Sequence, residues 1–197
     1  IGATIFRKEQ LLFKQFIDNI QLDQLLQLGA PPLLTSMPKF HYVHYDACYN
    51  FPSVGHNVCG SFDELAILSD TMDVVVVPHL HELHAHNFRF VSEITRVLRY
   101  SGFLVIYGFN PMSLWGVQRV LGLGNVVPWC PRFVNAHSII GQIEKHTLSL
   151  LEHNDYHAMP YTDSDWCNTL NLGGACPIPT RFGAIYQLVF QKLELLR

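Results

Sequence analysis

The residues best suited to chemistry in this sequence are four histidines, His79, His81, His84 and His86, which surround Glu82. Neutral imidazole is a common zinc ligand, and a His-x-His pair at the end of a strand can bind one metal ion. The sequence has no HExxH helix, and no aspartate stands where an HxHxD motif would need one. The alternative is that these histidines face solvent or a substrate. We assign no metal ligands here.

A buried strand is predicted directly before this cluster. Val74–Val77 is a run of four β-branched residues, which is typical of a strand covered on both faces in a parallel sheet. Pro78 cannot donate a hydrogen bond to a neighbouring strand and is expected to end the run. In an open α/β sheet, ligands bind at the carboxyl ends of the strands. His79 is therefore the histidine that we expect to point into a cleft.

A helix and a second strand are predicted after the cluster. Apolar residues on one helical face predict a helix over residues 90–98, which Gly102 is expected to end, and residues 103–107 form the next strand. A strand-helix-strand unit of this length implies parallel strands. Asn110 follows the second strand. It is either the cap of a further helix, with Trp115 as a core aromatic, or a contact to a ligand.

The rest of the sequence predicts one domain over residues 1–197. An N-terminal helix, within residues 1–22, buries the apolar face of residues 8–20. Further strands are expected at 25–29, 40–45, 147–151 and 184–193, and a further helix after Asn135, whereas 47–59 has a loop composition. Residues 63–68 fit a short helix or a third strand equally well. Residues 154–183 are predicted to be a long irregular insertion before the last strand.

Composition and missing motifs exclude several classes of function. The net charge is 13 − 16 = −3 without a basic run, so no nucleic-acid footprint is visible. No apolar stretch reaches the roughly 18 to 20 residues that span a bilayer. There is no GxSxG elbow and no P-loop. The five cysteines form no CxxC pair, which favours reduced thiols in a cytoplasmic protein.

Longer segments resemble a known family. ELAILSDTMDVVVVPHLHEL followed by EITRVLRYSGFLVI is similar to class I S-adenosylmethionine-dependent methyltransferases of the type 11 group. GFNPMSLWGVQRVLG and RFGAIYQLVFQKL resemble a bacterial subgroup of that family. The resemblance covers residues 25–192.

The resemblance implies a Rossmann-like α/β fold. It has a seven-stranded sheet that is mostly parallel with an antiparallel closing strand, and helices on both faces. It also implies S-adenosylmethionine as the cofactor. For such an enzyme, His79 and Asn110 are our candidate catalytic residues, and the low charge of the chain favours a small molecule or a protein over a nucleic acid as the methyl acceptor. The cofactor-binding positions that it implies are Gln27, Leu28, Gly29, Ala30, Asp46, Ser61, Phe62, Pro78 and His79.

The sequence departs from the family pattern after the first strand. Only the first glycine of the cofactor loop is present, as Gly29, while Pro31 and Leu33 stand where other glycines are expected. The carboxylate that would receive the methionine ammonium is replaced by Gln27, and the aspartate near adenine by Ser61. Proline fixes φ and removes a backbone donor, and leucine adds bulk.

These departures leave two functions open. The first is a methyltransferase with an altered cofactor loop, in which His79 would act as the base and Asn110 would position the substrate. The second is a non-catalytic binding or scaffolding protein that keeps the fold but has lost the cofactor. The sequence leaves the acceptor and the oligomeric state open.

Overall fold

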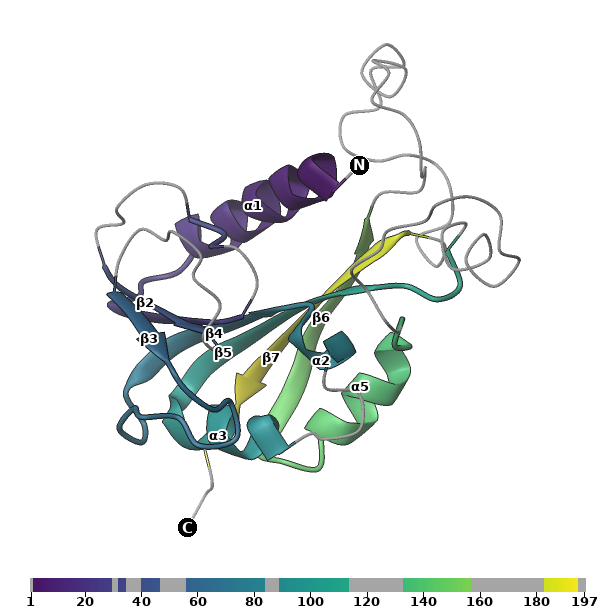
Figure 1. The fold of residues 1–197 in the computed structure, drawn as a ribbon. Helices are drawn as coiled ribbons and strands as arrows, with labels where there is room; N and C mark the ends of the chain where they lie inside the picture. Colours follow the sequence, from purple (N-terminus) through teal and green to yellow (C-terminus); the bar gives the residue numbers. More distant parts are fainter. Residues whose placement is uncertain are drawn as a thin grey trace.

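The computed structural model describes residues 2–29, 32–34, 40–46, 56–83, 89–113, 133–156 and 183–194. Figure 1 shows the arrangement of its helices and strands. In chain order they are α1 (Gly2–Asp18), β1 (Gln24–Leu28), β2 (His41–Asp46), β3 (His56–Cys59), β4 (Met72–Pro78), α2 (Leu80–Leu83), α3 (Arg89–Val97), β5 (Leu98–Phe109), α5 (Ala136–Ile143), β6 (Leu148–Tyr156) and β7 (Ile185–Lys192).

The strands form one seven-stranded sheet in the order β3-β2-β1-β4-β5-β7-β6. The pairs from β3 to β5 are all parallel, and β7 is antiparallel to both β5 and β6. The predicted fold class, a mostly parallel sheet with an antiparallel closing strand, is confirmed. The carboxyl ends of β1 to β5 therefore meet along one edge of the sheet.

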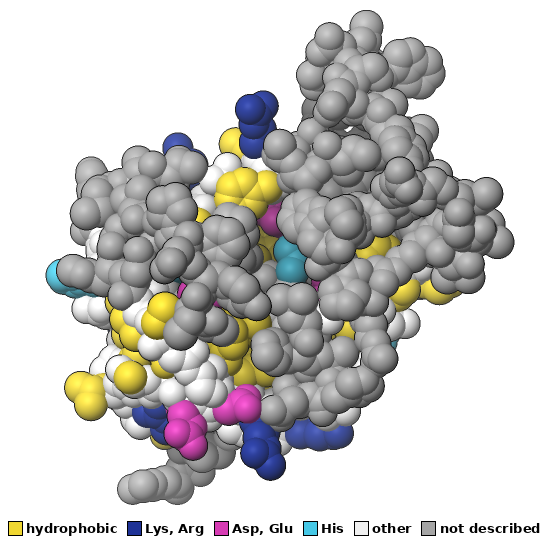
Figure 2. Space-filling view, viewed as in Figure 1, with side chains coloured by type: hydrophobic (Ala, Val, Ile, Leu, Met, Phe, Trp, Pro, Cys, Tyr) yellow, Lys and Arg dark blue, Asp and Glu magenta, His cyan; other side chains and the backbone are white. Residues whose placement is uncertain are grey.

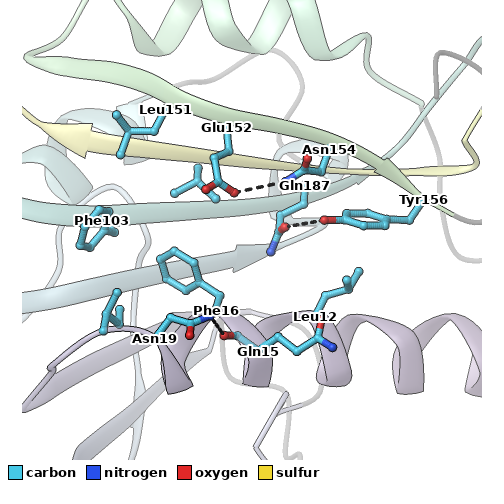
Figure 3. A pocket seen from close by; sticks show the side chains of 12 residues that line it. Leu12, Gln15, Phe16, Asn19, Phe103, Leu151, Glu152, Asn154, Tyr156 and Gln187 are labelled. Atoms are coloured by element: carbon cyan, nitrogen blue, oxygen red, sulfur yellow. Dashed lines mark hydrogen bonds between the residues drawn. The ribbon is translucent and has the colours of Figure 1, made fainter. Parts of the chain in front are cut away.

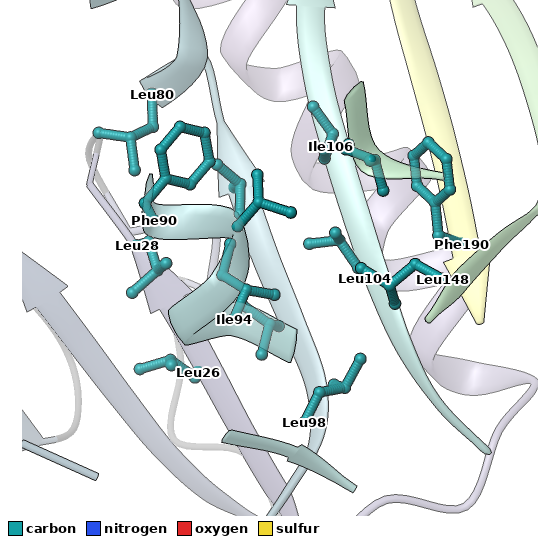
Figure 4. Close-up of a cluster of buried hydrophobic side chains, with 14 of the residues drawn as sticks. Leu26, Leu28, Leu80, Phe90, Ile94, Leu98, Leu104, Ile106, Leu148 and Phe190 are labelled. Atoms are coloured by element: carbon teal, nitrogen blue, oxygen red, sulfur yellow. The ribbon is translucent and has the colours of Figure 1, made fainter. Parts of the chain in front are cut away.

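Helices cover both faces of this sheet, with α1 on one face and α2, α3 and α5 on the other (Figure 1). The two faces bury separate apolar clusters. The cluster under α3 and α5 includes Leu26, Val75 and Ile94 (Figure 4). The cluster under α1 includes Phe13 and Val76. Every residue of Val74–Val77 is completely buried, as the β-branched run predicts.

The buried carboxylate of Asp73 connects three strands at the amino edge of the sheet. Asp73 accepts hydrogen bonds from the backbone N–H groups of Asp23 and Gln24 (2.5 and 2.8 Å) and pairs with Arg99 (2.5 Å). These contacts join the starts of β1, β4 and β5. The opposite, carboxyl edge is thereby held in register.

A second buried charge joins the closing strand to a helix. Lys192 of β7 donates to the carbonyl oxygens of Thr95 and Leu98 at the end of α3 (2.7 and 2.6 Å) and to Asp70 Oδ1 (2.7 Å). A cation is favourable at this helix end, because the last carbonyls of a helix carry partial negative charge.

Three predictions of local structure are wrong. Residues 56–59 are strand β3 rather than loop, because their backbone pairs with β2 from Val43 to Asp46. Residues 63–68 are neither helix nor strand. The expected insertion begins later than residue 154, since β6 continues to Tyr156; residues 157–182 lie outside the described residues.

The predicted role of Gly102 is also wrong. Helix α3 ends at Val97, and Gly102 lies inside β5, while Ser101 has the positive φ of 61°. A Cβ on Gly102 would come within 2.9 Å of the backbone oxygen of Asp73. Glycine is needed there because two backbones approach closely, and not because a helix stops.

Other predictions have mixed outcomes. Asn135 caps α5 as expected, its side chain accepting from the His137 N–H. Trp115 and the helix expected after Asn110 lie outside the described residues.

Within the part of the chain that the structure describes, no helix is long and apolar enough to cross a membrane. On the face in Figure 2, charged side chains of both signs gather along the lower edge.

Candidate ligand site at the carboxyl edge of the sheet

The sheet topology brings most of the predicted site residues to one edge. Gly29 follows β1, Asp46 ends β2, Ser61 and Phe62 follow β3, and His79 follows β4. Asn110 follows β5, the next strand in the same direction. Ala30, the remaining position of the β1 loop in the prediction, lies outside the described residues.

The chain leaves β1 in a conformation that favours glycine. Gly29 has φ +66°, and its N–H donates to the Tyr45 carbonyl of β2 (2.8 Å). A Cβ on Gly29 would meet Leu80 Cδ1 at 3.4 Å and Phe62 Cζ at 3.8 Å. Gly29 is buried, and the side chains of Leu80 and Phe62 pack beside its backbone where the segments after β1, β3 and β4 meet. Leu28, by contrast, is buried in the core and offers this edge only its backbone.

Gln27 is part of the fold itself. Its side chain is completely buried on the α1 face. The amide nitrogen donates to the Gly29 carbonyl (3.0 Å), and the amide oxygen accepts from the Leu33 N–H (2.9 Å) and the Tyr42 hydroxyl (2.8 Å). These bonds need both a donor and acceptors, which explains why an amide occupies the position where the family has a carboxylate.

Leu33 holds the other end of this loop. It is 2% exposed and packs in the α1-side cluster with Phe13 and Leu25. The bond from its N–H to Gln27 ties the same point of the loop to β1. The residues at positions 27 and 33, which differ from the family pattern, therefore act together. The Gln27 amide and the Leu33 side chain hold the loop after β1 against the core.

The ends of β2 and β3 place a carboxylate beside an aromatic ring. Asp46 is the last residue of β2 and is 8% exposed. Phe62 is buried and lies against Tyr45, with ring centroids 6.1 Å apart. Ser61 is exposed, and its hydroxyl accepts from the Asp63 N–H (3.2 Å). An acidic and an apolar side chain thus lie at the ends of β2 and β3, at the same edge of the sheet as Gly29.

His79 lies between two buried carboxylates. Its Nε2 is 2.7 Å from Glu9 Oε1 of α1, and its Nδ1 is 3.4 Å from Glu82 Oε2 of α2. The ring stacks on Phe109 with centroids 4.3 Å apart. Glu82 also accepts from the Phe109 N–H through its other oxygen (2.6 Å). The site joins α1, α2 and the end of β5 around one imidazole.

The backbone and charge of His79 both reflect this position. Its φ of +56° is unusual for a residue other than glycine, and such conformations persist where the surroundings impose them. Burial opposes the charged imidazolium, but Glu9 and Glu82 outweigh it and raise the pKa of His79 to about 10. At neutral pH the ring is a cation and holds its proton.

Asn110 forms a turn after β5. Its backbone N–H donates to the Ala184 carbonyl (2.9 Å), and its side-chain oxygen accepts from the Met112 N–H (2.9 Å). Its carbonyl accepts from the Ser113 hydroxyl (2.7 Å). The side-chain oxygen thus accepts within the turn. The helix that Asn110 is predicted to cap lies outside the described residues, so both the capping role and the role toward a substrate stay predictions.

Sequence reasoning did not identify Glu9. A signal was present: the apolar face of α1 contains Leu12, Phe13 and Phe16, and Glu9 lies three and four residues before the first two of these. A carboxylate in line with an apolar stripe must find a partner in the core. The partner is His79.

The histidine cluster is only partly visible. The side chains of His81, His84 and His86 lie outside the described residues. Among the side chains that are described, no group of three or more His, Cys, Asp and Glu could hold a metal ion.

Comparison with known proteins identifies the fold. Neither a protein-family model nor a curated protein matches the sequence. Solved structures do match. An S-adenosylmethionine-dependent methyltransferase from Thermotoga maritima has a TM-score of 0.66 at 13% identity, covering 95% of this chain and 91% of its own. One from Archaeoglobus fulgidus has a TM-score of 0.63 at 16% identity, covering 94% of each chain.

A third similar structure was solved with a protein partner. It is a chain from Haloferax volcanii, assigned as a methyltransferase, in complex with the Trm112 methyltransferase activator. Its TM-score is 0.63 at 11% identity, and the match covers 93% of this chain and 89% of that one. Together these likenesses show that the chain has the class I methyltransferase fold.

We predict that Gln27→Glu destabilises the protein by about 1–3 kcal/mol, because a carboxylate oxygen would replace the amide that donates to the Gly29 carbonyl. Urea unfolding followed by circular dichroism measures the change. Gln15→Glu, on the exposed side of α1, is the matched control and is expected to change stability by less than about 0.5 kcal/mol. Equal stability of the Gln27→Glu and wild-type chains would contradict the structural role of the amide.

We also predict that Glu9→Gln lowers the pKa of His79, because one of its two carboxylate neighbours is removed. The raised pKa means that the His79 contribution to stability is complete below about pH 6.5 and is lost as pH rises through about 10. In the variant this loss moves to lower pH. NMR titration of the His79 ring protons measures the pKa, with the exposed Glu144→Gln as control. An unchanged pKa in Glu9→Gln would contradict the ion pair.

Proposed function

We propose that this chain is an S-adenosylmethionine-dependent methyltransferase that binds its cofactor at the carboxyl edge of β1 to β4. The observation that carries the proposal is the arrangement of Gly29, Asp46 and Phe62 at the carboxyl ends of β1, β2 and β3, along one edge of the sheet. Gly29, at the end of the first strand, has a φ of +66°, a backbone conformation that glycine adopts without strain. The methyltransferase fold of the similar structures supports the same edge.

The residues present fit the adenosine half of the cofactor. A carboxylate accepts hydrogen bonds from two neighbouring hydroxyls, so Asp46 at the end of β2 would hold the ribose. Phe62 offers an apolar ring to adenine. Pro78 and His79 would border the cofactor from β4.

The methionine half needs a different contact from the one that the family pattern implies. Gln27 is neutral, and its amide groups already bond to Gly29, Leu33 and Tyr42. Glu9 and Glu82 are two carboxylates around one imidazolium, which gives the cluster a net charge of −1. That charge favours the ammonium and sulfonium cations of the cofactor.

The protonation of His79 restricts the reaction. The cofactor supplies an electrophilic methyl group, and in-line displacement needs the acceptor positioned behind that carbon. An imidazolium cannot take a proton, so His79 serves as a base only after losing its own. A small-molecule or protein acceptor that is already a nucleophile at neutral pH therefore suits this site better than one that must be deprotonated there.

A second function is favoured by the loop after β1. Because Gln27 and Leu33 fasten the loop to the core, the chain is alternatively a non-catalytic methyltransferase-fold protein that binds a partner. The Haloferax volcanii chain, which was solved with an activator protein, illustrates that proteins of this fold form such complexes.

Isothermal titration with S-adenosylmethionine and S-adenosylhomocysteine separates the two functions. We expect binding of both, and about a tenfold to hundredfold loss of affinity in Asp46→Asn, because the ribose hydroxyls lose a charged acceptor. Asp18→Asn, an exposed acid at the end of α1, is the control and is expected to bind like the wild type.

Absence of heat and of any thermal shift at millimolar cofactor, in a chain that unfolds cooperatively, would sink the enzyme proposal. Equal cofactor affinity in Asp46→Asn and Asp18→Asn would still show that the chain binds the cofactor, but it would contradict the proposed contact between Asp46 and the ribose.

A further inference from the structure

A groove lies between α1 and the face formed by β5, β7 and β6 (Figure 3), and none of the described residues that line it is one of the proposed cofactor contacts. Its volume is about 330 Å³, at the lower end of the range for small-molecule sites. In Figure 3 the side chains of α1 point up toward the strands, and those of β6 and β7 line the opposite wall.

The floor of the groove is apolar and aromatic. Phe16 of α1 and Phe103 of β5 meet edge to face, with ring centroids 5.8 Å apart and an interplanar angle of 84°. Leu12 and Val189 extend the same surface. Both aromatic rings line the groove, so an aromatic surface is available to a molecule bound there. A face of this kind attracts cations as well as apolar groups.

The rim is polar and carries one charge. Among the described residues that line the groove, Glu152 of β6 is the only charged one, and Asn154 donates to its carboxylate (3.2 Å). Deeper in the groove, Gln187 accepts from the Tyr156 hydroxyl (3.2 Å) and donates to Tyr107 (2.7 Å). The polar wall is thus held in place by the fold before any ligand arrives.

An irregularity in β6 creates this wall. The register of β6 on β7 shifts between Leu150 and Glu152, so that Glu152 lies opposite Val189 and Asn154 lies opposite Gln187. Without that shift the alternation of the strand would turn Glu152 to the other face of the sheet. Bulges of this kind are frequent beside functional sites, where they redirect a side chain.

We propose that this groove binds a small organic amine, with its apolar body on Phe16 and Phe103 and its ammonium group at Glu152. A single carboxylate beside two aromatic rings selects a cation with an apolar body over a neutral molecule or an anion. This site is separate from the proposed cofactor edge, and it does not require that the chain be a methyltransferase.

Saturation-transfer NMR and titration with 2-phenylethylamine and its anionic counterpart 3-phenylpropionate test the site. We expect the amine to bind about three- to tenfold more tightly than the acid, from the charge and the aromatic faces. Glu152→Gln is expected to abolish this preference, while Glu144→Gln, an exposed acid on α5, retains it. Both variants change exposed side chains, and thermal melts verify that they fold.

Equal binding of amine and acid to the wild type, or a preference that survives Glu152→Gln, would overturn the proposal, as would binding of neither probe. Asp46→Asn is expected to bind the amine like the wild type. The outcome for this groove is therefore independent of the outcome for the cofactor edge.

Discussion

His79 interacts with Glu9 from α1 and with Glu82 from α2, and its ring stacks on Phe109 at the end of β5. The carboxyl edge of the sheet depends on this arrangement. A buried carboxylate without a partner would be strongly unfavourable, and here one imidazolium compensates two of them. The contact also orients α1 across the sheet, where Phe13 packs against the strands. One charged ring thus connects the N-terminal helix to the loop after β4.

The same edge has two halves that differ in character. At the ends of β1 to β3 lie a glycine, a carboxylate and a phenyl ring, the groups that we propose to bind a nucleoside. At the ends of β4 and β5, the buried charged groups of His79, Glu9 and Glu82 lie together. Gln27 separates the two halves, because its amide closes the β1 loop onto the core. A cofactor that spans both halves would exchange the usual carboxylate at β1 for a negative charge reached from α1 and α2.

The sequence predicts the sheet better than it predicts the site. Val74–Val77 identifies β4 because β-branched residues suit a strand buried on both sides. Strand β3 has no apolar run of its own and exists because its backbone pairs with β2, which a local pattern cannot reveal. Gly102 was interpreted as a helix stop, whereas a contact with Asp73, distant in sequence, requires it. Local sequence patterns predict the helices and strands, but contacts with segments distant in sequence determine where those helices and strands begin and end.

The candidate site, like the sheet, could be predicted from the sequence only in part. The place of His79 after a buried strand, and the resemblance to the methyltransferase family for Gly29 and Asp46, were enough to expect these residues at one edge. The pairing of His79 with Glu9 joins residues 70 positions apart, and it changes the expected charge of the histidine. No motif contains this information. An acidic residue that interrupts an apolar helical face, as Glu9 does, is the one local sign of such a contact.

A crystal structure of the chain with S-adenosylhomocysteine tests the central claim most directly. The account predicts adenosine against Phe62, the ribose hydroxyls on the Asp46 carboxylate, and the amino group of the homocysteine half within reach of Glu9 or Glu82. A ligand bound elsewhere on the molecule, or an amino group held at Gln27 with the β1 loop released from Leu33, would contradict it.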